Sequence, residues 1–101
     1  MLRQGYYIGK TEAEIASELC SEGTPPRRVI ERPGSRYDSH TSPQDILMAF
    51  LGGSAEIVIG GRVFHCQTGD RLLINGHVEH SGVVGYEGCE YMMTLMPTLA
   101  D

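Results

Sequence analysis

The sequence predicts an all-β domain, folded as a small sandwich or closed barrel, with one short α-helix near its N-terminus. From residue 27 onward, about eight short apolar runs recur at intervals of roughly 8–12 residues, separated by turns that contain glycine. Before these runs, Thr11-Glu12-Ala13-Glu14 has the spacing of a capping box, in which threonine and glutamate side chains accept hydrogen bonds from free backbone N–H groups at a helix start. Together the two patterns indicate a β-structure with a helix attached to it.

The helix should extend over residues 12–21. Its apolar face should pack against the rest of the domain and consists, at helical spacing, of Ile15, Ala16, Leu19 and Cys20. Its opposite face should be solvated and consists of Glu12, Glu14, Glu18 and Glu22. Gly23 and then Pro25-Pro26 end the helix.

The strands follow from apolar runs and alternation. We expect them over residues 27–32, 37–42, 46–51, 55–59, 62–67, 71–74, 79–84 and 89–96. Gly60-Gly61 and Asn75-Gly76 should form tight turns, because glycine and asparagine tolerate the positive φ that such turns need. Tyr6-Tyr7-Ile8 fits either a short strand or an arm that lies on a partner.

Length and charge limit the classes of function. The 101 residues suffice for one domain, residues 1–101. A net charge of -5 argues against nucleic acid and anionic membranes, which bind positive surfaces. No apolar run approaches the ~20 residues that span a bilayer, and the first residues lack the apolar region of a secretory signal. We therefore expect a cytoplasmic protein that binds no nucleic acid and no membrane.

The cysteines agree with this location. Cys20, Cys66 and Cys89 are odd in number and lack CxxC spacing. Free thiols in a reducing compartment fit this pattern. We expect each cysteine to be a small buried hydrophobe.

Residues from 34 to 96 resemble the cupin superfamily. The second cupin motif is Gly, five residues, Pro, one residue, Gly, two residues, His. Gly69 to His80 keeps that spacing, with Asn75 in place of the proline and His77 in place of the second glycine. Residues 51–61 are similar to the central hairpin of the family. The resemblance implies a double-stranded β-helix of jelly-roll type, with residues 1–24 as N-terminal arm and helix and residues 25–101 as the barrel.

The resemblance also implies positions for metal ligands. The first cupin motif supplies His, one residue, His, three or four residues, Glu. Aligned on it, His40 takes the first histidine position, but Ser42 and Ile46 replace the second histidine and the glutamate. Asp45 lies one residue from the glutamate position, and a bulge would turn it inward. His40, Asp45 and His80 would then form a 2-His-1-carboxylate set for one divalent ion such as Fe, Mn, Zn or Ni.

A metal-free pocket is the other interpretation of the same residues. His80 would then bind a ligand by hydrogen bonding, and His77 would be either a pocket residue or a turn residue held by backbone bonds. Alternation should turn half of the group Tyr91-Met92-Met93 into the barrel, which gives an apolar pocket with one polar handle. The expected ligand-binding residues are His40, Ser42, His77, His80, Tyr91 and Met93.

Three functional hypotheses follow. In the first, a single-domain cupin binds a small organic molecule in its barrel, with a degenerate or absent metal site. In the second, it is a metal-dependent enzyme, such as a dioxygenase, isomerase or lyase, that uses His40, Asp45 and His80. In the third, it is an interaction module with a vestigial pocket. Because a short chain exposes sheet edges and one apolar helix face, we also expect a homodimer to which residues 1–32 contribute.

Overall fold

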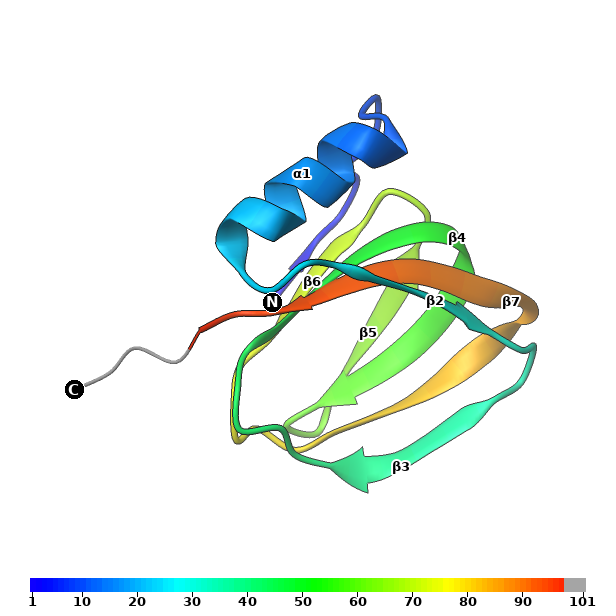
Figure 1. Ribbon diagram of the computed structural model, residues 1–101. Coiled ribbons are helices and arrows are strands. Elements are labelled where there is room, and N and C mark those ends of the chain that lie inside the picture. Colours follow the sequence, from blue (N-terminus) through cyan, green and yellow to red (C-terminus); the bar gives the residue numbers. More distant parts are fainter. Residues whose placement is uncertain (98–101) are drawn as a thin grey trace.

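The computed structural model describes residues 1–97 and confirms an all-β fold with one N-terminal helix (Figure 1). Within those residues the elements are β1 (Leu2–Arg3), α1 (Glu12–Glu22), β2 (Arg27–Glu31), β3 (Arg36–His40), β4 (Ile46–Ile59), β5 (Arg62–Gln67), β6 (Arg71–Ile74) and β7 (His80–Leu95). Every strand pairing is antiparallel. No helix in this part of the chain is long and apolar enough to cross a membrane.

The long strands β4 and β7 bend and contribute to both walls of the barrel. Residues 46–50 of β4 lie between β6 and the C-terminal half of β7, in the wall ordered β1-β6-β4-β7-β2. Residues 55–59 of β4 lie between β5 and the N-terminal half of β7, and β3 extends this second wall. The prediction of two separate strands in each region was wrong, because the chain bends at the glycine-rich segments and the pairing continues beyond the bend after shifts of register.

The bend has a steric requirement for glycine. Gly53 has φ +69°, a left-handed conformation that other residues rarely adopt. A Cβ atom at this position would lie 2.0 Å from the carbonyl oxygen of Gly88 on the neighbouring strand. Gly88 itself has φ +79°. The two walls can therefore meet at this corner only because β4 and β7 approach each other without side chains.

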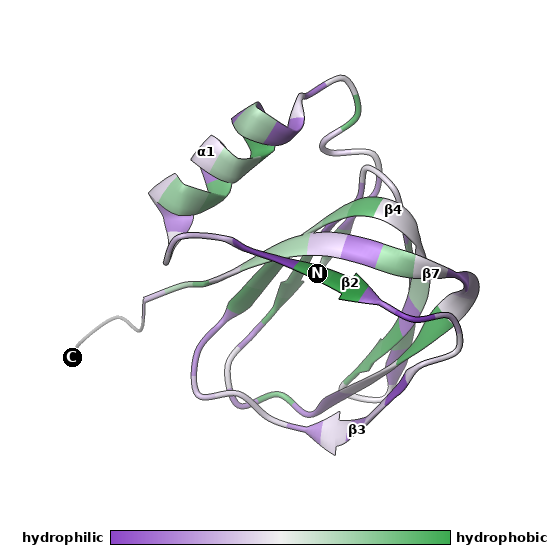
Figure 2. Cartoon of the chain, turned by 45° about the vertical axis from the view of Figure 1, so that its right-hand side comes forward, coloured by the Kyte–Doolittle hydropathy of each residue, from purple (hydrophilic) through white to green (hydrophobic). Residues whose placement is uncertain are grey.

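The wall formed by β4 is buried on both faces, which explains its continuous apolar run. Met48 and Phe50 pack inside the barrel, whereas Leu47 and Ala49 pack outside it, under α1. The helix contributes two fully buried residues to the outer cluster, Ile15 and Leu19. Figure 2 shows hydrophobic (green) segments on both the helix and the strands below it. The predicted apolar helix face is confirmed for Ile15 and Leu19, whereas Ala16 is half-buried and Cys20 is exposed.

The N-terminal segment lies on its own barrel. β1 pairs with β6, and the N–H of Tyr7 donates to the carbonyl of Gly69 at 2.8 Å. The Tyr7 side chain is only 2% exposed. The short strand lies at Leu2–Arg3, whereas Tyr6-Tyr7-Ile8 belong to turns that dock against the same chain, so the strand alternative for these three residues was wrong.

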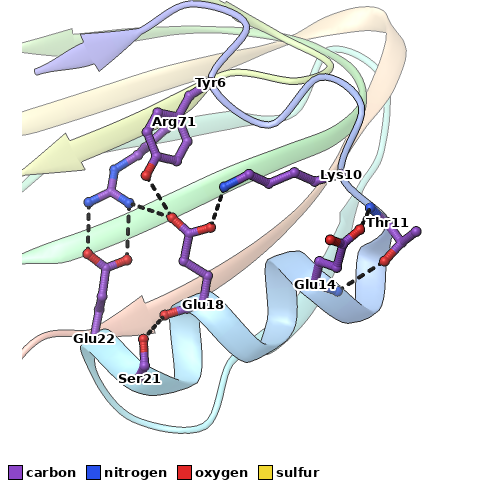
Figure 3. A network of polar contacts seen from close by, with 8 residues as sticks. All are labelled: Tyr6, Lys10, Thr11, Glu14, Glu18, Ser21, Glu22 and Arg71. Carbon is purple, nitrogen blue, oxygen red and sulfur yellow. Dashed lines mark hydrogen bonds and ion pairs between the residues drawn. The ribbon is translucent and has the colours of Figure 1, made fainter.

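The acidic face of α1 is not simply solvated (Figure 3). Glu22 accepts two hydrogen bonds from the guanidinium of Arg71 on β6, each 3.0 Å long. Glu18 accepts hydrogen bonds from Tyr6 Oη at 2.8 Å and Lys10 Nζ at 2.7 Å. These bonds attach the helix to the barrel and the N-terminal segment, so the prediction was wrong for Glu18 and Glu22.

The helix start is the predicted one. Thr11 Oγ1 accepts from the N–H of Glu14 at 3.1 Å, and the Glu14 carboxylate accepts from the N–H of Thr11 at 2.9 Å. The capping box is therefore confirmed. The cysteines are free, as expected, but only Cys66 and Cys89 are buried.

Candidate ligand-binding pocket

A cavity of about 160 Å³ lies inside the barrel, between its two walls. Most of its lining is aliphatic or aromatic and comes from the inward positions of β4, β6 and β7: Ile46, Met48, Phe50, Ala55, Ile57, Ile74, Val84 and Met93. Polar atoms enter this lining at two places. One is a pair of histidines, His40 and His80, and the other is a pair of tyrosines, Tyr37 and Tyr91.

The histidines come from two neighbouring strands. His40 at the end of β3 is the register partner of His80 at the start of β7. Their ring centroids are 4.2 Å apart, and the ring planes make an angle of 62°. His80 is 7% exposed, whereas His40 is exposed at the pocket rim.

Both imidazoles are oriented by the backbone of their own strands. Nδ1 of His40 lies 2.8 Å from the carbonyl oxygen of Asp38, and Nδ1 of His80 lies 3.0 Å from that of Val78. A carbonyl oxygen can only accept, so each Nδ1 must carry the proton. In the neutral ring, Nε2 then keeps a lone pair and acts as a hydrogen-bond acceptor.

The tyrosines share a carboxylate behind the pocket wall. Tyr91 Oη donates to Glu31 on β2 at 3.4 Å, and Tyr37 lies close to the same carboxylate. Burial, followed by the charge of Glu31, raises the pKa of Tyr91 to about 12. Burial and the hydrogen bond to Glu31 also raise the pKa of Tyr37. Both hydroxyls therefore stay protonated at neutral pH.

Two predicted ligand-binding residues, Ser42 and His77, do not line the cavity. His77 is exposed in the turn after β6, with φ +64°. Its N–H donates to the carbonyl of Ser42 at 2.7 Å, so the two residues join the turn to the loop before β4. This is the turn role that the sequence left open for His77. His40, His80, Tyr91 and Met93 do line the cavity.

Comparison with known families agrees with a ligand-binding barrel. Residues 27–100 match the model of the AraC-like ligand binding domain. The chain belongs to this family. No curated protein is a significant match to the sequence.

The fold of this AraC-like domain is similar to that of solved cupin structures. A conserved protein of unknown function from Streptococcus pyogenes is 20% identical, with a TM-score of 0.66 over 74% of this chain and 65% of that one. An RmlC-like cupin from Shewanella frigidimarina is 18% identical, with a TM-score of 0.66 over 73% and 66% of the two chains. The AraC-like domain therefore spans slightly less than two thirds of either structure. At these identities the likeness concerns the fold, and it confirms the cupin barrel.

The residues of this AraC-like domain do not fit a cupin metal centre. Oxalate decarboxylase from Bacillus subtilis, a structural neighbour, is described with Mn(II) centres. It is 22% identical, with a TM-score of 0.66 over 81% of this chain and 23% of that one. Here the Asp45 carboxylate accepts from the N–H of Gly76 at 2.6 Å and is not part of the pocket lining. Ile46 lines the pocket in its place. Within residues 1–97, no three His, Cys, Asp or Glu side chains are grouped to hold an ion.

Proposed function

We propose that this AraC-like domain binds a small organic molecule inside its barrel through His40, His80, Tyr91 and Met93, without a metal ion. The observation that carries the proposal is the apolar cavity bordered by one buried imidazole. Small-molecule sites generally combine a mostly apolar lining with few polar groups that orient the ligand. The family match supports a ligand-binding role for residues 27–100.

The size of the cavity limits the ligand. An apolar protein cavity of about 150 Å³ accepts a benzene molecule. The present cavity, at about 160 Å³, fits a ligand with a single ring or a short branched chain. We therefore expect a compound of low molecular mass, smaller than a nucleotide or a disaccharide.

A fragment titration followed by NMR of the labelled protein tests this proposal. We expect single-ring fragments to shift the amide signals of β4 and β7 residues around the cavity. The variant Ile46→Phe should abolish these shifts, because Ile46 is a half-buried lining residue and a phenyl ring there would fill the cavity. Val63→Phe is the matched control, since Val63 is exposed on β5 and does not line the cavity. Shifts that survive Ile46→Phe, or no shifts with any fragment, would contradict the proposal.

The two alternative functions receive less support. The metal-dependent enzyme needs Asp45 beside His40 and His80, whereas the Asp45 carboxylate is bonded to the turn at Gly76. The interaction module with a vestigial pocket predicts no ligand at all, so the fragment titration separates it from the proposal. We further propose that the protein acts in the cytoplasm, where its free thiols stay reduced.

A further inference from the structure

We infer that the ligand carries a hydroxyl group that donates hydrogen bonds, and that it is an uncharged phenol or alcohol rather than a carboxylate. This inference rests on the proposed function, because it assumes that the cavity is the binding site. The donor or acceptor character of the lining groups determines which ligands bind, and it is separate from whether a ligand binds there at all.

The histidines present acceptors. The Nδ1–H of His40 donates to the carbonyl oxygen of Asp38, and that of His80 donates to the carbonyl oxygen of Val78. Nε2 of His80 has no hydrogen-bond partner among residues 1–97. In this part of the chain, Tyr7 Oη is the only polar side-chain atom that is both fully enclosed and without a partner, so Nε2 of His80 is not fully enclosed. Nε2 of His80 is therefore accessible, although the residue is only 7% exposed, and His80 is one of the residues that line the cavity. An acceptor of this kind is satisfied by an O–H donor.

The tyrosines present the same polarity. Tyr91 Oη donates a hydrogen bond to Glu31, which leaves the Tyr91 oxygen with lone pairs as acceptors. Tyr37 lies beside the same carboxylate. Tyr37 pairs with Gly82 and His40 with His80, so the two pairs are attached at backbone positions about 7 Å apart along β7. A single-ring compound with a hydroxyl group can reach one site while its ring contacts the apolar lining.

An anionic ligand has no permanently charged partner among the residues that line this cavity. Among the described residues, no lysine or arginine is part of the lining. The carboxylate of Glu31, which accepts a hydrogen bond from the lining residue Tyr91, repels negative charge. Ser81 borders the cavity, but alternation along β7 from His80 turns its side chain to the outer face. A carboxylate that entered the cavity would therefore lose its hydrogen bonds to water and meet the lone pairs of acceptors and a like charge, which costs free energy.

Four matched probes test the inference: phenol, which donates and accepts, anisole, which only accepts, toluene, which does neither, and benzoate, which is anionic. Their dissociation constants should be measured by NMR titration at pH 8, above the range in which free histidine takes up a proton. We expect phenol to bind about tenfold more tightly than toluene or anisole, which corresponds to one net hydrogen bond. Benzoate should bind most weakly.

Two variants assign the selectivity to the imidazoles. His80→Phe keeps a ring but removes Nε2, so the preference for phenol over toluene should disappear while toluene still binds. His40→Phe tests the same loss at an exposed position and keeps an aromatic ring beside His80. His65→Phe is the control, because His65 is exposed on β5 and does not line the cavity.

The outcomes separate this inference from the proposed function. If benzoate or anisole binds as tightly as phenol, or if the preference for phenol survives both His80→Phe and His40→Phe, the inference is wrong while the cavity remains a binding site. If none of the four probes binds, the proposed function fails and the inference fails with it.

Discussion

His40 and His80 face each other from paired positions of β3 and β7, with ring centroids 4.2 Å apart. The Nδ1–H of each ring donates a hydrogen bond to the carbonyl oxygen two residues before it. The pair therefore has a fixed orientation before any ligand arrives. Because the described lining holds no third group of a facial triad, we propose that the two imidazoles act as hydrogen-bonding groups.

The first prediction concerns metal removal. Fragment binding should be unchanged by EDTA, because no residue-bound ion takes part in the proposed site. Plasma mass spectrometry of untagged protein, after incubation with Fe, Mn, Zn or Ni and dialysis, should give far less than one equivalent. The variant His80→Ala should give the same value. About one equivalent that is lost in His80→Ala would show instead that the two histidines recruit a further ligand.

The second prediction concerns the corner of the barrel. Gly53→Ala should lower the free energy of unfolding by about 4 kcal/mol or more, since the new Cβ meets a carbonyl oxygen as well as an unfavourable φ. Gly9→Ala is the control: Gly9 has φ +87° but no atom within 4 Å of the new Cβ, so it should cost only about 1–2 kcal/mol. Urea denaturation measures both values. Equal losses would mean that the corner has room for a side chain.

The third prediction concerns the attachment of α1. The Arg71 side chain is 15% exposed and makes a bidentate pair with Glu22. Arg71→Met should lower the free energy of unfolding by about 2 kcal/mol, because it leaves Glu22 and Glu18 without their common cation. Arg27→Met, at an exposed position of β2, should change it by less than about 0.5 kcal/mol. Denaturation curves that are superimposable for the two variants would contradict this role.

The fourth prediction concerns pH. Hydrogen bonds from Lys10 and Tyr6 lower the pKa of Glu18 in the folded protein. The folded state therefore binds the Glu18 proton less readily than the unfolded state, and this stabilisation is complete above the unfolded pKa and lost as pH falls through the folded one. Glu18→Gln should remove that part of the acid dependence. Thermal unfolding between pH 7 and pH 3 should show a shallower decline in the variant, and parallel curves would rule this contribution out.

The fifth prediction concerns assembly. The apolar helix face is covered by the barrel of the same chain, so this part of the argument for a homodimer was wrong. The argument from sheet edges remains, because β2 ends one wall and its Ile30 is 76% exposed. Figure 2 shows a hydrophobic middle of β2 between hydrophilic segments.

Light scattering tests the homodimer. We expect twice the 11.1 kDa mass of the chain, and the monomer mass for Ile30→Lys. Val63→Lys, at another exposed valine on β5, should leave the dimer intact. A monomer across a wide concentration range would refute the prediction.

The sequence alone was sufficient for those features that depend on neighbours along the chain. The capping box at Thr11 and Glu14 is made within one helical turn, and the strands follow a period of two with turns marked by glycine. The positions of Tyr91 and Met93 on the cavity wall followed from the same alternation, once β7 was assumed to face a barrel interior.

Only the tertiary structure decided what depends on distant partners. The pattern could not show that Glu18 and Glu22 meet Arg71, or that Asp45 bonds the N–H of Gly76, because each partner lies more than 30 residues away in the sequence. It also could not show that Gly52-Gly53 bends a continuous strand, since the ladder to β7 determines this. Local patterns determine which residues form strands and the helix. The register between strands determines which side chains meet, and that contact produced the acceptor-lined cavity at His40 and His80.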